Sequence, residues 1–133
     1  MNQQRLATIA ERHRARLILQ FGSSVSGKTH AGSDVDLAVL LEQPDLSTQG
    51  YAELVHDLQE LVNGAEVDVV VLNRADPLLL KQVSDGCVRL YGSEREFQRF
   101  RLLAFKRYQD YRPYLELERR YVARALERDF PPS

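Results

Sequence analysis

The organisation of the chain is decided by residues 17–41, which read LILQFGSSVSGKTHAGSDVDLAVLL. Two short apolar runs, 16–21 and 35–41, flank a stretch of small and polar residues, and this pattern is typical of two β-strands joined by a loop. The first run ends at Gly22-Ser23, and the second follows directly on Asp34. A glycine-containing turn and a carboxylate are therefore expected at the ends of successive strands.

Three aspartates form the candidate catalytic and metal-binding set. Asp34 and Asp36 are two residues apart in a predicted strand, so their side chains point to the same side. Asp68 interrupts a third apolar run, 66–72. If the strands are neighbours, three carboxylates gather at one rim of the sheet, and at least one must then take up a proton. A divalent cation such as Mg²⁺ or Mn²⁺ would remove this repulsion and suits hard oxygen ligands.

The turn after the first strand is a candidate phosphate site. Gly22 allows the backbone to approach a phosphate closely, and the hydroxyls of Ser23 and Ser24 and the following N–H groups can bind an anion. Lys28, later in the same loop, is a candidate contact to a triphosphate. Phosphate-binding groups beside metal-binding carboxylates indicate phosphoryl or nucleotidyl transfer.

Length and composition exclude several classes of protein. The 133 residues suffice for one domain, and 44% hydrophobic and 28% charged residues are ordinary for a globular chain. No apolar run approaches the ~20 residues that span a membrane, and the N-terminus resembles no signal peptide. The single cysteine, Cys87, forms no internal disulfide, which favours a cytoplasmic location.

Charge is distributed unevenly along the chain. Residues 1–88 carry a net charge of −5 and residues 89–133 carry +4. This asymmetry suggests a polarity between a site and a partner surface, whereas a general nucleic-acid binder would have a larger basic excess. No direct binding of nucleic acid is therefore expected.

The remaining pattern predicts an α/β (α+β) fold. Its small mixed sheet is expected to carry helices on one face and to be followed by a helical C-terminal extension. We expect one domain overall, with a core at residues 1–92 and an extension at 93–133 that packs on the core or on a partner. Pro113 is expected to kink or split the extension. The other predicted helices are 3–14, 48–63 and 77–85, and the predicted strands are 16–21, 35–41, 66–72 and 88–91.

Gly22-Ser23, the Asp34-Val35-Asp36 motif and Asp68 together resemble the DNA polymerase β-like nucleotidyltransferases. Small size and the stretch 67–77 resemble the minimal nucleotidyltransferases that serve as antitoxins in HEPN/MNT toxin–antitoxin pairs. The resemblance implies an Mg²⁺-dependent adenylyltransferase that moves AMP from ATP to a tyrosine of a HEPN ribonuclease toxin and so silences it. It further implies that Gly22 and Ser23 hold the triphosphate.

The same resemblance assigns the acidic residues. Asp34 and Asp36 would bind Mg²⁺, and Asp68 would complete the triad and help to deprotonate the acceptor hydroxyl. Two alternatives stay open. The chain could neutralise a toxin by binding alone, through the long aromatic stripe of 97–126, or it could modify a small molecule such as an aminoglycoside.

Overall fold

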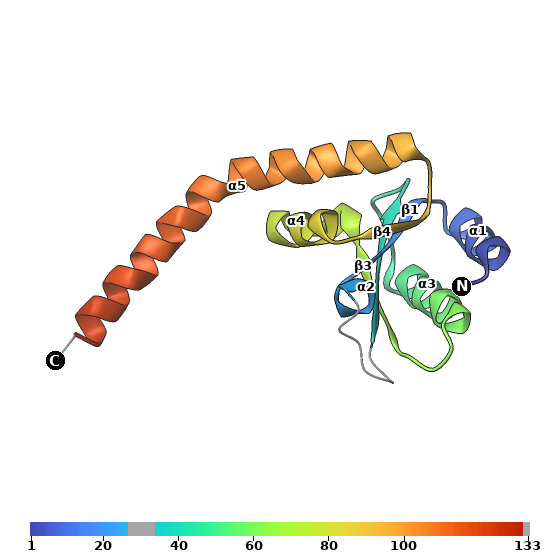
Figure 1. The fold of residues 1–133 in the computed structure, drawn as a ribbon, viewed down its shortest axis with the longest axis horizontal. Coiled ribbons are helices and arrows are strands. Elements are labelled where there is room, and N and C mark those ends of the chain that lie inside the picture. Colours follow the sequence, from blue (N-terminus) through green and yellow to red (C-terminus); the bar gives the residue numbers. More distant parts are fainter. Residues whose placement is uncertain (27–33, 132–133) are drawn as a thin grey trace.

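The computed structural model describes residues 1–26 and 34–131. Its centre is a four-stranded mixed sheet with the strand order β3-β2-β1-β4. Figure 1 shows helices packed around this sheet and one long helix that reaches far beyond it. In chain order the elements are α1 (Gln3–Arg12), β1 (Ala15–Phe21), α2 (Ser23–Ser26), β2 (Val35–Leu41), α3 (Thr48–Leu61), β3 (Val67–Val71), the 3₁₀ helix η1 (Leu72–Arg74), α4 (Pro77–Asp85), β4 (Val88–Tyr91) and α5 (Glu94–Asp129).

Local sequence signals set the starts of the long helices. Asn2 caps α1 by accepting hydrogen bonds from the next turn, and Ser47 does the same for α3. Asp76 caps α4 with Pro77 in its first turn, and Ser93 accepts from the Glu96 amide at the start of α5. Each side-chain oxygen satisfies an amide that has no partner within its helix. The predicted elements agree with the observed ones to within about two residues, the usual uncertainty of helix ends.

The pairing of the strands brings three of their ends to one edge of the sheet. β1 runs antiparallel to β2, with Phe21 opposite Asp36. β2 runs parallel to β3, with Asp36 opposite Asp68. The end of β1 therefore lies beside the beginnings of β2 and β3.

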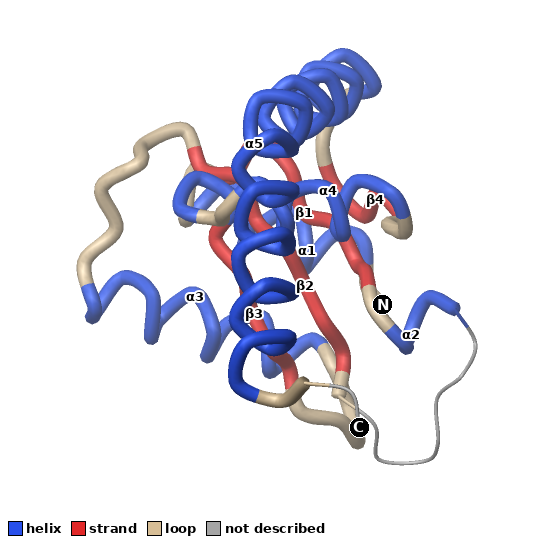
Figure 2. The backbone as a smooth tube through the Cα atoms, turned by 90° about the vertical axis from the view of Figure 1, so that its left-hand side faces the viewer, coloured by secondary structure: helices blue, strands red, loops and turns tan. Residues whose placement is uncertain are grey.

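Helices cover both faces of the sheet. On one face α1 and α3 pack on a cluster that includes Ile18, Leu37 and Val69. On the other face α4 and the first part of α5 cover Leu19 and Ala38, and Figure 2 shows these two helices together. The expectation of helices on one face only was therefore wrong. The second layer forms because the inward residues of α4 and α5 bury the side of the sheet that carries Ala38.

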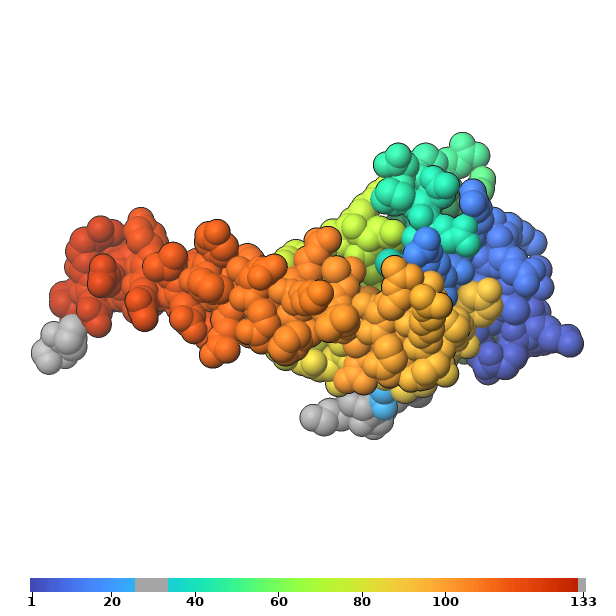
Figure 3. Space-filling model, turned by 90° about the horizontal axis from the view of Figure 1, so that it is seen from above, coloured from blue at the N-terminus to red at the C-terminus, as the bar shows by residue number. Residues whose placement is uncertain are grey.

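The C-terminal extension is a single helix of 36 residues. Pro113 does not split it, although the helix axis changes direction part-way along its length (Figure 1). A proline within a helix removes one backbone hydrogen bond and bends the axis. Phe100 and Ala104 are buried against the sheet layer, whereas the distal half projects from the body (Figure 3).

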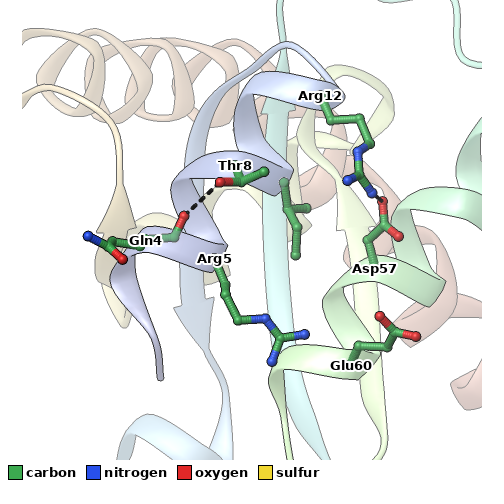
Figure 4. Close-up of a pocket in the computed structure, with 7 residues that line it drawn as sticks. Gln4, Arg5, Thr8, Arg12, Asp57 and Glu60 are labelled. Atoms are coloured by element: carbon green, nitrogen blue, oxygen red, sulfur yellow. Dashed lines mark hydrogen bonds and ion pairs between the residues drawn. The ribbon is translucent and has the colours of Figure 1, made fainter.

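Helix α1 is fastened to α3 by a cluster of polar side chains. Asp57 lies 2.6 Å from Nε2 of His13 and 3.1 Å from Nη1 of Arg12. The pKa of Asp57 lies below its usual value, mainly because His13 hydrogen-bonds to the carboxylate, with Arg12 adding to this effect. Figure 4 shows the adjoining pocket between the two helices. Within the described part of the chain no helix is long and apolar enough to cross a membrane.

Candidate active site

The three predicted carboxylates lie at one edge of the sheet. Asp36 and Asp68 occupy facing positions on β2 and β3, so their side chains share one face. Asp34 immediately precedes β2 and is exposed, as is Asp68, whereas Asp36 is half-buried. The face that they share also carries Ala38 and Val70, which belong to the core beneath α4 and α5.

Gly22 lies directly against Asp36. Its φ of +80° is one that residues with a side chain adopt only at a cost. A Cβ atom at this position would lie 2.2 Å from Oδ2 of Asp36 and 3.1 Å from its Cγ. The positive φ and the close approach of the Asp36 carboxylate therefore both require glycine at this position.

The turn after Gly22 is held in place from within. Nε2 of Gln20 donates to Oγ of Ser24 at 3.0 Å, and that hydroxyl donates to the carbonyl of Phe21 at 3.3 Å. The amide of Val25 donates to the carbonyl of Gly22 at 3.1 Å. Ser24 thus braces the turn, while Ser23 is exposed at the start of α2. Lys28 lies outside the described residues.

The electrostatics of the edge are those of clustered like charges. The pKa of Asp36 is raised, first by burial and then by the negative charges of Asp68 and Asp34. Among the residues that the structure describes, no lysine, arginine or histidine forms an ion pair with these three carboxylates. Asp68 thus has no arginine partner among the described residues. The arrangement favours a positively charged ligand.

The donor set suits a hard divalent cation in chemistry, although it is not yet closed around one. Within residues 1–26 and 34–131, no three acidic, histidine or cysteine side chains form a ready-made ligand set. Asp36 and Asp68 face the same space, and the exposed Asp34 lies two residues before Asp36. Mg²⁺ is usually bound by one or two carboxylates together with waters and substrate phosphates, so these three carboxylates suffice.

A pocket of about 430 Å³ adjoins the turn. It is lined by Gly22, Val25, Gln82, Gly86 and Cys87, which belong to the α2 turn and to the C-terminal end of α4 and the residues after it. Burial raises the pKa of the Cys87 thiol, so the thiol favours its neutral form. The pocket gives the glycine turn an open space on the α4 side.

Comparison with known proteins identifies the family to which this edge belongs. Residues 4–96 match the family described as polymerase beta, nucleotidyltransferase. The chain belongs to this family. It is also 31% identical over 107 residues to the protein adenylyltransferase MntA of Shewanella oneidensis, a match that covers 80% of this chain and 73% of the relative. The resemblance inferred from the sequence is confirmed.

Solved structures of relatives share the whole architecture. A crystal structure of a toxin–antitoxin with AMP-PNP contains a chain that is 26% identical and superposes with a TM-score of 0.75, over 95% of this chain and 98% of that one. A second, of a tri-AMPylated Shewanella oneidensis HEPN toxin in complex with an MNT antitoxin, is 24% identical with a TM-score of 0.67, over 93% and 94%. This second likeness shows the fold alone.

The glycine turn also carries a second phosphate-binding sequence pattern, which the pairing of β1 with β2 excludes. Residues 22–29, GSSVSGKT, match the P-loop pattern G-x-x-x-x-G-K-[ST], so the interpretation that the chain lacks this pattern was wrong. A P-loop feeds a helix that crosses to a parallel strand, which needs a dozen or more residues. Here β2 begins at Val35 and runs antiparallel to β1, so the chain has no room for such a crossover.

Sequence reasoning also missed Gln20, which holds the turn of this nucleotidyltransferase through Ser24. A signal was present, because Gln20 is the only polar residue in the run 17–21 and stands next to the glycine turn. Gln82 and Gly86 of the pocket gave no such signal, since they reach the turn only through the packing of α4.

Proposed function

We propose that the chain is the antitoxin of a HEPN/MNT pair and acts as a protein adenylyltransferase. It transfers AMP from ATP to a tyrosine hydroxyl of a HEPN ribonuclease toxin, releases pyrophosphate and so inactivates the toxin. The observation that carries this proposal is the contact of Gly22 with Asp36, with Asp68 opposite Asp36 on the next strand. Two similarities support it, namely the named activity of the Shewanella oneidensis relative and the AMP-PNP bound in a related toxin–antitoxin.

Each candidate residue has a role in this proposal. Gly22 and Ser23 present backbone amides and a hydroxyl to the triphosphate, Ser24 braces them, and Lys28 supplies positive charge from the loop. Asp34, Asp36 and Asp68 would hold Mg²⁺, and Asp68, which is exposed, also accepts the proton of the incoming hydroxyl. Bound Mg²⁺ would neutralise charge on the phosphates and on the leaving pyrophosphate. A related structure carries two Asp-to-Glu substitutions spaced two residues apart, the spacing of Asp34 and Asp36.

The proposal extends to the division of the chain and to its location. Residues 1–92 form the transferase domain, and residues 93–133 form an extension that packs on this domain or on the partner. The reaction takes place in the cytoplasm, where ATP is available and where the free thiol of Cys87 stays reduced.

A second candidate function is neutralisation by binding alone. It is favoured by the apolar residues that α5 exposes beyond the body, among them Leu117 and Tyr121. In this case the carboxylates would be dispensable for protection against the toxin.

The decisive experiment measures intact mass after incubation of the purified chain with ATP, Mg²⁺ and its cognate HEPN protein. We expect the HEPN protein to gain one or more AMP units. Asp36→Asn should abolish the gain, whereas Asp45→Asn, the same change at an exposed loop position, should leave it intact. A stable complex without any gain in mass for the wild type would instead establish binding alone. A gain that persists in Asp36→Asn would refute the assignment of the site.

A further inference from the structure

The apolar stripe of α5 continues beyond the body that it packs on. In the first half of the helix Phe100 and Ala104 are buried. Steps of three, four or seven residues carry the same face on to Leu115 and Val122. Figures 1 and 3 show that this part of the helix has no other element of the described chain beside it.

We name this face the distal α5 surface. Tyr114 and Tyr121 each precede a stripe residue by one position and widen it, and their side chains are 69% and 73% exposed. Val122 and Leu126 are about half exposed. Contiguous apolar area of this kind on a projecting helix marks an interaction site more often than an idle surface. The surface consists of Tyr111, Tyr114, Leu115, Tyr121, Val122 and Leu126.

The charges on this half of the helix indicate the chemistry of its partner. Arg112 and Arg128 are paired with acidic side chains of the helix itself. Among the described residues from 105 onward, five cations form no ion pair, against three acids. Arg107 lies four residues before Tyr111 and Arg119 four residues after Leu115, so both border the stripe, whereas Glu118, four residues after Tyr114 and four before Val122, lies within it. The cations are Lys106, Arg107, Arg119, Arg120 and Arg124, and the acids are Asp110, Glu118 and Glu127.

We propose that the distal α5 surface binds an amphipathic helix of the HEPN toxin whose apolar stripe is bordered by acidic residues. The identity of this partner rests on the function proposed above. An apolar face with aromatic anchors suits helix-to-helix packing, and the bordering arginines select acidic neighbours. The assignment also fits the reaction, because Asp36 and Asp68 lie on the sheet face that α4 and α5 cover. A toxin held along α5 is thus held on the side of the molecule where its tyrosine must arrive.

A second copy of the chain is a poorer occupant. A symmetric contact between two copies places the same patch on both partners. Both copies would then present the borders formed by Arg107 and Arg119, and like charges oppose such an association. An acidic toxin helix meets no such repulsion.

The test compares binding of the cognate HEPN protein to three forms of the full chain by calorimetry. Tyr114→Ser/Tyr121→Ser removes two exposed anchors, and we expect Kd to rise at least about tenfold. Phe105→Ser is the matched control, because Phe105 is an exposed aromatic that follows Ala104 and so lies on the opposite flank of α5 from the two tyrosines, outside the distal α5 surface. We expect this control to bind like the wild type. Circular dichroism should show equal helix content in all three forms.

The outcomes separate this inference from the proposed function. If the wild type transfers AMP but the tyrosine variant binds and transfers equally well, the distal α5 surface is not the docking site although the enzyme assignment stands. If no form transfers AMP but the tyrosine variant alone loses binding, the surface assignment stands and the transferase proposal fails. Sizing of the chain alone should give a monomer, and a dimer that the tyrosine variant dissolves would assign the surface to a second copy and overturn the proposal.

Discussion

Replacement of Gly22 by alanine is the sharpest test of the contact between the glycine turn and the carboxylates. Two penalties combine at this position. A φ of +80° costs an L-residue about 1–2 kcal/mol. The new Cβ would also stand 2.2 Å from Oδ2 of Asp36. The carboxylate would have to move by about 1 Å, off its rotamer, at a further ~0.5–1.5 kcal/mol.

The free energy of unfolding of Gly22→Ala should therefore fall by about 2–3 kcal/mol. AMP transfer should fall by about 100-fold, since a displacement of this size at a reacting centre has that effect. Gly64→Ala is the control, because Gly64 has the same φ of +80° but a Cβ added there would have nothing within 4 Å. The free energy of unfolding of this variant should fall only by the cost of the backbone conformation, about 1–2 kcal/mol. Its rate of AMP transfer should equal that of the wild type.

Urea unfolding and a radiolabelled AMP-transfer assay would measure both quantities. A further variant isolates the clash, since Asp36→Ala removes the atoms closest to the new methyl group. In that background Gly22→Ala should lower the free energy of unfolding by no more than Gly64→Ala does. If Gly22→Ala matches Gly64→Ala in stability and transfer while Asp36 is intact, the contact does not constrain the site and the reasoning is wrong.

Three other side chains give predictions that rest on their individual contacts. Asp36→Asn should unfold at a higher urea concentration than the wild type at pH 7, because the raised pKa of Asp36 means that its ionised form destabilises the fold. This gain in stability should vanish as the pH falls below the usual pKa of 3.8, where Asp36 is protonated in both the folded and the unfolded chain. Asp57→Asn should lose about 1–3 kcal/mol of stability at pH 7. Because the folded pKa of Asp57 is lowered, its contribution is present above 3.8 and disappears as the pH falls through the folded value, so urea midpoints of variant and wild type should converge in acid. Gln20→Ala should slow AMP transfer about tenfold and cost about 0.5–1.5 kcal/mol, whereas Gln49→Ala, which loses only a surface bond to Glu53, should be neutral in the transfer assay.

The sequence predicted those parts of the site that depend on strand periodicity. Asp36 and Asp68 were placed on a shared face because side chains alternate along a strand, and the parallel register of β2 and β3 sets them opposite each other. The contact of Gly22 with Asp36 could not be predicted. It depends on the antiparallel register that sets Phe21 opposite Asp36, which no local pattern specifies.

Helix α5 shows a second feature that the sequence pattern does not predict. Phe100 and Val122 belong to a single stripe in the sequence, yet Phe100 is buried and Val122 is half exposed. The difference arises because the body of the protein ends part-way along the helix, and periodicity carries no information on that boundary. The second helical layer was missed for a related reason, since α4 packs on the sheet through contacts distant in sequence.

Because β3 lies at the edge of the sheet, Asp68 also affects the solubility of the chain. β3 reads Val67-Asp68-Val69-Val70-Val71, and apart from its acid it is a short, valine-rich edge strand. Such edges recruit strands of other molecules and seed aggregates unless a charge interrupts them. Asp68 is exposed and supplies that interruption, so this residue also acts as a gatekeeper against self-association. Inactive versions of the chain are therefore better made at Asp36 than by an apolar substitution of Asp68, which would leave an unbroken hydrophobic strand on an open edge.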